Sequence, residues 1–169
     1  MEKFIPQIYK KNLFSINYDK LKELGIKLLI FDLDNTLSLV REKTPQKKIK
    51  DFVNKLSNDF KILVASNNTK ERVSLFCKDM YVDILYRACK PFNRTSKYLK
   101  ENNILNNEVA IIGDQMVTDI YLGNRCGYLT ILVDPMGEEY LKVSAINQCL
   151  EKRIRKRIDF KKGDYYEKK

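Results

Sequence analysis

Short apolar runs alternate along the chain with segments in which apolar residues recur every three or four positions. Five of these runs end in polar residues and are predicted to be strands, at residues 28–30, 61–65, 82–86, 109–112 and 128–133. A continuous apolar run of this length is typical of a parallel strand that is covered on both faces. The pattern therefore predicts an α/β fold: a three-layer, doubly wound, Rossmann-like parallel sheet of about five strands.

The segments between the runs are long enough to form helices. One helix is predicted to begin at Thr44-Pro45, because proline is favoured at the first helical position. Its apolar face consists of Ile49, Phe52, Val53, Leu56 and Phe60. Further helices are predicted at residues 69–80, at residues 93–102, and after residue 114, ending near Gly127.

The last predicted element is a basic amphipathic helix at residues 139–158. Its apolar side consists of Val143, Ile146, Leu150, Ile154 and Ile158, and its other side carries Lys152, Arg153, Arg155, Lys156 and Arg157. Such a helix can cover the sheet and show its charge to water, or it can dock on a surface. The same choice, between packing on the domain and an interfacial contact, holds for Phe4, Ile5, Ile8, Tyr9, Leu13 and Phe14.

The composition is typical of one globular domain. The chain has 169 residues, of which 44% are apolar and 32% are charged. No uncharged apolar run approaches the roughly 18 residues of a membrane span, and the start lacks the apolar segment of a secretory signal. We expect a cytoplasmic protein with a single domain over residues 1–169. It would consist of an N-terminal flank (1–27), a catalytic core (28–138) and a basic C-terminal helix and tail (139–169).

The net charge of +10 lies mainly at the two ends of the chain, since eight of the ten excess positive charges fall in residues 1–27 and 151–169. Such flanks can be solvated tails, or they can bind anionic lipid or nucleic acid. The chain has no histidine, and its four cysteines form no CxxC pair. A zinc site and a histidine-activated nucleophile are therefore not expected. We expect the cysteines to be small buried apolar side chains.

Polar residues follow the predicted strands at their carboxyl ends, where parallel sheets bind their ligands. They are Asp32 and Asp34 after the first strand, Ser66 and Asn67 after the second, Lys90 after the third, and Asp114 and Asp119 after the fourth. If the first strand lies between the second and the fourth, these groups meet at one edge. Neighbouring carboxylates repel each other unless a cation lies between them, and Mg²⁺ is the usual one. The set suits phosphoryl transfer, in which a carboxylate can be the nucleophile.

Each of these residues also has a purely structural alternative. Asp34 or Asn35 can cap a turn, and Ser66 can cap a helix. Lys90 can be a surface lysine, and Asp119 can be a charge on an exposed helix face.

Four motifs in this order resemble those of the haloacid dehalogenase (HAD) superfamily of phosphohydrolases. They are Asp32-Leu33-Asp34-Asn35-Thr36, Ser66 in LVASNN, Lys90 in ACKP, and Asp114 with Asp119 in GDQMVTD. The resemblance implies that Asp32 is the nucleophile and Asp34 the acid/base. It implies that Asp32, the backbone carbonyl of Asp34 and Asp114 hold Mg²⁺. It also implies phosphate binding by Ser66, Asn67 and Lys90, with Thr36 and Asp119 in supporting roles.

Cap domains, which many members of this superfamily insert, do not fit in residues 37–61 or 69–89. An uncapped site favours large substrates such as a protein, a nucleic-acid end or a lipid headgroup at a membrane. More narrowly, the whole chain resembles the subfamily IIIA phosphatases of the YqeG type, which are related to the mitochondrial and plastid phosphatidylglycerophosphatases. This resemblance is carried by Pro6, Gly25–Lys27, Ser66–Asn68, Lys90-Pro91, GDQ..TD, Gly123–Gly127 and the basic tail.

The resemblance implies removal of the terminal phosphate from phosphatidylglycerophosphate, with a phosphorylated lipid headgroup as substrate and the anionic inner membrane face as a docking surface. Two alternatives stay open. One is a capless phosphatase for a phosphoprotein or a nucleic-acid end. The other is a non-enzymatic partner of RNA or the ribosome that uses the basic tail. The intact pair Asp32 and Asp34 argues against the last, because a binding module does not need both acids.

Overall fold

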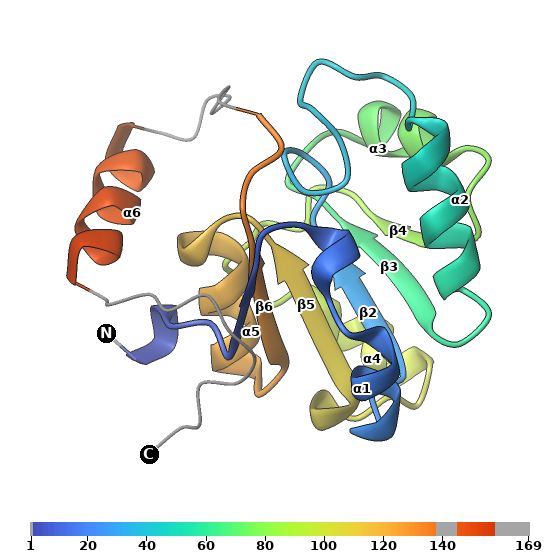
Figure 1. The fold of residues 1–169 in the computed structure, drawn as a ribbon, viewed down its shortest axis with the longest axis horizontal. Coiled ribbons are helices and arrows are strands. Elements are labelled where there is room, and N and C mark those ends of the chain that lie inside the picture. The colour runs from blue at the N-terminus through green and yellow to red at the C-terminus, as the bar shows by residue number, and fades with distance from the viewer. Residues whose placement is uncertain (1, 138–144, 158–169) are drawn as a thin grey trace.

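The computed structural model describes residues 2–137 and 145–157 of the chain. Its centre is a six-stranded sheet in which all neighbouring strands run parallel (Figure 1). The strands are β1 (Ile8–Lys10), β2 (Leu28–Phe31), β3 (Lys61–Ala65), β4 (Asp83–Leu85), β5 (Val109–Gly113) and β6 (Leu129–Val133). Their order across the sheet is β1-β6-β5-β2-β3-β4. The predicted α/β parallel sheet is confirmed, with β2 between β3 and β5.

Helices connect the strands and cover both faces of the sheet. The α-helices are α1 (Tyr18–Glu23), α2 (Lys47–Leu56), α3 (Lys70–Cys77), α4 (Thr95–Glu101), α5 (Tyr121–Cys126) and α6 (Ala145–Arg157). Short 3-10 turns are η1 (Glu2–Phe4), η2 (Leu13–Ser15) and η3 (Asn106–Glu108), and η4 (Met116–Ile120) is a π-helical turn that continues into α5. Figure 1 shows α2 on one side of the sheet and α6 at the opposite end of the molecule.

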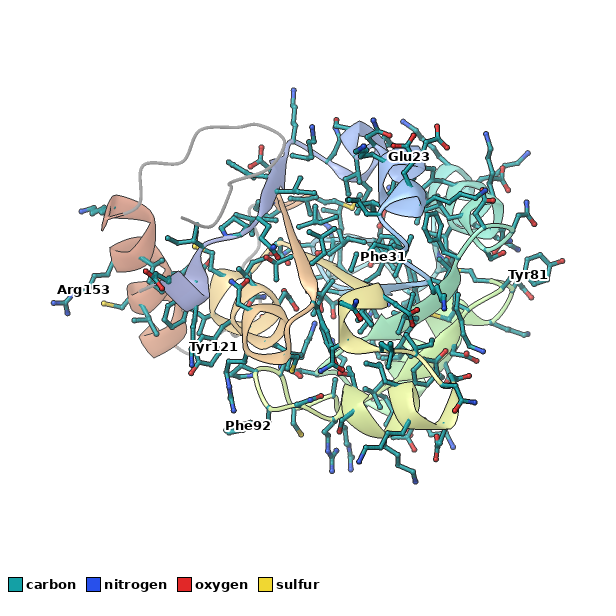
Figure 2. The ribbon with its side chains drawn as sticks, turned by 90° about the horizontal axis from the view of Figure 1, so that it is seen from below. Glu23, Phe31, Tyr81, Phe92, Tyr121 and Arg153 are labelled. Atoms are coloured by element: carbon teal, nitrogen blue, oxygen red, sulfur yellow. The ribbon has the colours of Figure 1, made fainter. Side chains whose placement is uncertain are left out.

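The central strand β2 is buried on both faces, and its four residues are at most 1% exposed. Leu29 belongs to the core that β2 shares with α2 and α3. Leu28 belongs to the core on the other face, with α4 and α5. Figure 2 shows Phe31, the last residue of β2, in the interior of the molecule. This burial explains why the strand appears in the sequence as an unbroken apolar run.

The sequence pattern missed the edge strand β1. Its residues Ile8–Lys10 pair with β6, with Ile8 opposite Ile131. A strand of three residues carries no periodic signal, so its pairing with β6 defines it. Nearby, the ring of Phe4 stacks on Tyr121 with centroids 4.7 Å apart. These contacts favour packing on the domain over an interfacial contact for the N-terminal segment.

Helix α2 begins later than predicted. Its N-cap is Gln46, which has an extended backbone conformation (φ −61°, ψ 144°), so the helix starts at Lys47. The prediction that Pro45 is its first residue is wrong. Proline fixes only its own φ near −65°, a value that suits an extended turn as well as a helix.

The cysteines also differ in part from the expectation. All four are free thiols; Cys77 is buried and Cys126 is half-buried, but Cys89 and Cys149 are exposed. The prediction of buried side chains is therefore wrong for these two. Cys89 lies in the loop before Lys90 with a positive φ of 53°, and this loop leaves its side chain facing solvent.

Helix α6 packs on the π-helical turn η4. The carboxylate of Glu151 accepts a hydrogen bond of 2.9 Å from the backbone N–H of Met116. Ile154 is 3% exposed and lies in an apolar cluster with Met116. The described part of this basic helix thus covers the domain. Val143, Ile158 and the other residues at 139–144 and 159–169 lie outside the described residues.

The two connections considered above for a cap domain are short. A loop and α2 alone join β2 to β3, and α3 alone joins β3 to β4. Every residue of these two connections is described, and neither of them inserts a cap domain. Across residues 2–137 and 145–157, no helix is both long enough and apolar enough to cross a membrane.

Candidate active site

The carboxyl ends of β2 and β5 form the point at which the strand order reverses. From β2 the chain continues to β3 on one side, and from β5 it continues to β6 on the other. Ligands of open α/β sheets bind at such a point. Asp32 follows β2 directly and Asp114 follows β5. The N–H of Asp32 donates to the carbonyl of Ile112 at 2.9 Å. Asp114 follows Ile112 by two residues, so Asp32 and Asp114 lie on neighbouring segments of backbone.

Three carboxylates and one ammonium group are buried together at this edge. Oxygen atoms of Asp32, Asp114 and Asp119 all lie within 4.8 Å of one another, and none of these residues is more than 8% exposed. Nζ of Lys90 lies 2.7 Å from Oδ1 of Asp119 and also donates to Oδ1 of Asp32. A single ammonium group does not balance three carboxylates. Such a set of buried oxygens is what a hard divalent cation binds, so the triad can hold a metal ion.

The electrostatics of the cluster follow from its burial. Desolvation, together with the nearby carboxylates of Asp119 and Asp34, raises the pKa of Asp32 to about 7 against the lowering effect of Lys90. Desolvation likewise holds the pKa of Asp114 well above its usual range, with Asp32 and Asp119 adding to the effect. Burial alone would lower the pKa of Lys90, but Asp119 and Asp32 outweigh it, so this pKa is raised. Shifts of this kind are typical of functional sites.

Two small residues shape the acidic cluster. Oγ1 of Thr36 donates to Oδ1 of Asp114 at 3.1 Å. A Cβ atom on Gly113 would lie 2.4 Å from both Cγ and Oδ2 of Asp119, so only glycine allows this carboxylate to approach. Asp119 itself lies in η4, where the sequence predicted a regular helix. Such π-helical turns are frequent at functional sites.

The end of β3 supports the lysine. Nδ2 of Asn67 donates to the carbonyl of Lys90 at 3.1 Å, and its Oδ1 accepts from the N–H of Lys90 at 2.7 Å. The side chain of Asn67, expected to bind phosphate, therefore holds the backbone of the lysine loop. Ser66 is 2% exposed, and its hydroxyl accepts from the N–H of Asn68 at 3.2 Å. Thr69, and not Ser66, is the N-cap of α3.

Asp34 has a different set of partners from Asp32. Its Oδ2 accepts from Nδ2 of Asn68 at 2.7 Å, and its Oδ1 accepts from a guanidinium nitrogen of Arg72 at 3.0 Å. Asn35 follows with a positive φ of 64°, a conformation that asparagine tolerates. Asn68 was noted in the sequence only as part of the Ser66–Asn68 motif, and no role was predicted for Asn68 or Arg72. In the sequence they resemble any polar residues at the start of a helix, and their position shortly after Ser66 was the one available signal.

The purely structural roles considered for Lys90, Asp119 and Asp34 do not fit their positions in the structure. Lys90 is 7% exposed and Asp119 is 1% exposed, so neither is a surface charge. The carboxylate of Asp34 contacts Asn68 and Arg72 from another element. The structure thus brings together the predicted residues Asp32, Asp34, Thr36, Ser66, Asn67, Lys90, Asp114 and Asp119 at one edge of the sheet.

A parallel sheet with two acidic residues after its central strand, a buried lysine and an acidic turn after the adjacent strand defines a phosphatase of the HAD type. The sequence model of the family described as "Mitochondrial PGP phosphatase" matches residues 1–137, and the chain belongs to this family. The predicted phosphatase class is thereby confirmed. The reading as a non-enzymatic partner of RNA or the ribosome is not supported.

Individual relatives agree with the family. The chain is 35% identical over 153 residues to "Probable phosphatase YqeG" of Bacillus subtilis (strain 168), a match that covers 89% of each chain. It is 27% identical over 143 residues to "Phosphatidylglycerophosphate phosphatase 1, chloroplastic/mitochondrial" of Arabidopsis thaliana, over 78% of this chain and 41% of that protein. A crystal structure of an uncharacterized protein from Listeria monocytogenes serotype 4b shares the fold, with a TM-score of 0.54 and 19% identity. That match covers 79% of this chain and all of the other.

Proposed function

We propose that this phosphatase depends on Mg²⁺, works through an aspartyl phosphate on Asp32, and converts phosphatidylglycerophosphate to phosphatidylglycerol. The observation that carries the proposal is the buried pair of Asp32 and Lys90 beside the carboxylates of Asp114 and Asp119. Phosphoryl transfer needs a positioned nucleophile and positive charge around the transferred group, and this edge supplies both. In this proposal, residues 1–169 form one catalytic domain that acts from the cytoplasm at the inner membrane face.

The residues take the following parts in the reaction. A carboxylate oxygen of Asp32 attacks phosphorus, the bond from phosphorus to the leaving oxygen breaks, and Asp34 protonates that oxygen. Asp34 then takes a proton from a water molecule, which attacks the aspartyl phosphate and releases inorganic phosphate and free Asp32. Lys90 and Ser66 bind the phosphoryl oxygens throughout, and the side chain of Asn67 holds the backbone of Lys90 in place for this.

The acidic cluster fits a hard divalent cation because its donors are carboxylate oxygens that are buried and close together. Asp32, Asp114 and the backbone carbonyl of Asp34 would hold Mg²⁺, with Asp119 beside them. When bound, the ion neutralises negative charge on the carboxylates and on the phosphoryl oxygens.

The surface next to the site supports a lipid substrate. Phe92 follows Lys90 by two residues and is 69% exposed, and Figure 2 shows it at the periphery of the molecule. Arg87 and Arg94 flank it and are exposed, and Nη1 of Arg94 donates to the carbonyl of Arg87 at 2.9 Å. An exposed aromatic ring between cations suits the interface of an anionic bilayer. The name of the Arabidopsis relative points to the same substrate.

Phosphate release from phosphatidylglycerophosphate in mixed micelles tests the proposal, with the wild type and Asp32→Asn compared with and without Mg²⁺. We expect release by the wild type alone, and only with Mg²⁺, while Asp32→Asn keeps its fold by circular dichroism. Mass spectrometry of the acid-quenched reaction should find phosphate on Asp32. Turnover by Asp32→Asn would rule out the covalent mechanism. An equal or faster rate on a phosphopeptide or a 5′-phosphorylated oligonucleotide would rule out the lipid as the preferred substrate.

A further inference from the structure

Arg72 lies in the first turn of α3 and reaches back over the loop that follows β2. Its Nη2 atom lies 3.0 Å from Oδ1 of Asp34, 3.2 Å from Oγ of Ser38 and 3.4 Å from the carbonyl oxygen of Val40. The side chain is 17% exposed. Its guanidinium carbon lies 5.6 Å from the ring centre of Phe76, one turn further along α3. The side chain is thus held between its own helix and the catalytic loop.

This arrangement leaves the guanidinium group few alternative orientations. The group is planar, so an ion pair, two further acceptors and an aromatic ring together fix its position closely. The start of α3 is fixed as well, because the hydroxyl of Thr69 accepts from the N–H of Arg72 at 3.4 Å. An arginine that served only solubility would extend into water. Here the side chain connects the beginning of α3 to Asp34.

The second oxygen of Asp34 is held from the same segment of chain. Nδ2 of Asn68 donates to Oδ2 at 2.7 Å, and Asn68 lies four residues before Arg72. Asp32, by contrast, contacts Lys90 deeper in the site and has a less exposed side chain, at 10% against 20% for Asp34. The segment that begins at the end of β3 therefore sets the orientation of the Asp34 carboxylate.

We propose that Arg72 is a positioning residue of the phosphatase reaction. It acts through Asp34, which it turns, together with Asn68, towards the leaving oxygen that accepts its proton and then towards the water molecule that gives one up. The inference rests on the proposed role of Asp34 as acid/base. It adds a second role to the segment after β3. This segment contains Ser66, and it also holds the acid/base Asp34 in place through Asn68 and Arg72.

Substrates with different leaving groups test this inference. We compare kcat/KM for phosphatidylglycerophosphate, whose alkoxide needs a proton to leave, with kcat/KM for p-nitrophenyl phosphate, whose phenolate leaves without one. This parameter reports steps up to the formation of the aspartyl phosphate. Arg72→Gln should lose about ten-fold on the lipid, a part of what general acid catalysis contributes, and less than about three-fold on the aryl phosphate. The matched control is Arg125→Gln, an exposed arginine of α5 that should leave both values unchanged.

A double variant shows whether Arg72 acts through Asp34. In the background of Asp34→Asn, Arg72→Gln should cause no further loss, because the group that it positions is gone. Arg72→Lys keeps the charge and should recover part of the rate. It also serves as the test variant if Arg72→Gln fails to fold, and must then show the same substrate difference. Equal losses on both substrates, or a further loss in the Asp34→Asn background, would overturn the inference. Turnover by Asp32→Asn would instead overturn the proposed function.

Discussion

Lys90 and Asp119 form a buried ion pair, in which Nζ lies 2.7 Å from Oδ1 and the side chains are 3% and 1% exposed. Lys90 comes from the loop after β4, and Asp119 comes from the turn after β5. Two strands, β2 and β3, separate these elements in the sheet. The same ammonium group contacts Asp32 at the end of β2. The pair therefore connects both halves of the sheet across the active site.

Replacing this lysine should impair both catalysis and folding. Lys90→Met leaves the buried carboxylates of Asp32 and Asp119 without their ammonium partner, and breaking a buried pair costs about 3–5 kcal/mol. We expect a loss of at least about 100-fold in kcat, because a charge that stabilises the transition state is removed. Lys97→Met is the control, since that side chain is 84% exposed. Urea unfolding and phosphate release measure the two effects, and activity within two-fold of the wild type would contradict the assigned role.

The stability of the metal-free protein should fall as the pH rises through the acidic cluster. The pKa of Asp32 is about 7 in the folded protein against a usual value of 3.8, so between these values the folded state holds more protons than the unfolded chain. The free energy of unfolding then decreases as the pH rises through this window. A pKa difference of one corresponds to about 1.4 kcal/mol, so chemical denaturation can detect the change.

The control for this pH dependence is Asp32→Asn, whose stability should vary less between pH 4 and 7 because its amide does not titrate. Mg²⁺ should raise the unfolding midpoint of the wild type at neutral pH, where the ion replaces protons in the cluster. If the stability of both proteins changed equally with pH, Asp32 would not be the group that governs this pH dependence.

Gly113 should be required for the site and not merely for the fold. In Gly113→Ala the new methyl group would lie 2.4 Å from Cγ of Asp119 and would push this carboxylate away from Lys90. We expect at least a ten-fold loss of activity and weaker stabilisation by Mg²⁺ in a thermal-shift titration. The matched control is Gly127→Ala. Its Cβ meets no atom within 4 Å, but its φ of 76° makes alanine less stable by about 1 kcal/mol. Unchanged Mg²⁺ stabilisation in Gly113→Ala would count against the assignment of Asp119 to the metal site.

Phe92 should contribute to binding at a lipid surface and not to the phosphoryl-transfer step. Phe92→Ser is expected to lower the affinity for phosphatidylglycerol vesicles, measured by sedimentation, by roughly 30-fold, because about 2 kcal/mol of aromatic burial is lost. The rate on micellar substrate should fall with it. The rate on p-nitrophenyl phosphate should stay the same. Tyr81→Ser is the control, since Tyr81 is 75% exposed and Figure 2 shows it far from Phe92. Equal effects of the two variants would show that the loop containing Phe92 does not contact the membrane.

Most of the site could be located from the sequence because its residues follow strands. Asp32, Ser66 and Asp114 each come directly after a buried apolar run, and parallel strands place their carboxyl ends at one edge. The order of the strands was needed only to show that β2 lies between β3 and β5. Gly113 is the first residue of the GDQMVTD motif, but the reason for a glycine there, the close approach of Asp119, required coordinates.

Other features depended on contacts between distant parts of the chain. Strand β1 is defined by its pairing with β6, more than a hundred residues away, and three residues alone carry no pattern. The same holds for Asn67, whose side chain turned out to hold the backbone of Lys90. Arg72 resembled an ordinary helical cation until its distance to Asp34 was known.

The sequence by itself determined the parallel sheet, the absence of a cap and the set of groups at the strand ends. These follow from local periodicity, from the lengths of the connections and from the fixed direction of parallel strands. Only the tertiary structure decided which carboxylates share the ammonium group of Lys90, and which one, Asp34, is held by Arg72 instead. Burial, charge balance and hydrogen-bond distance act between elements that are far apart in the chain, so no local pattern records them.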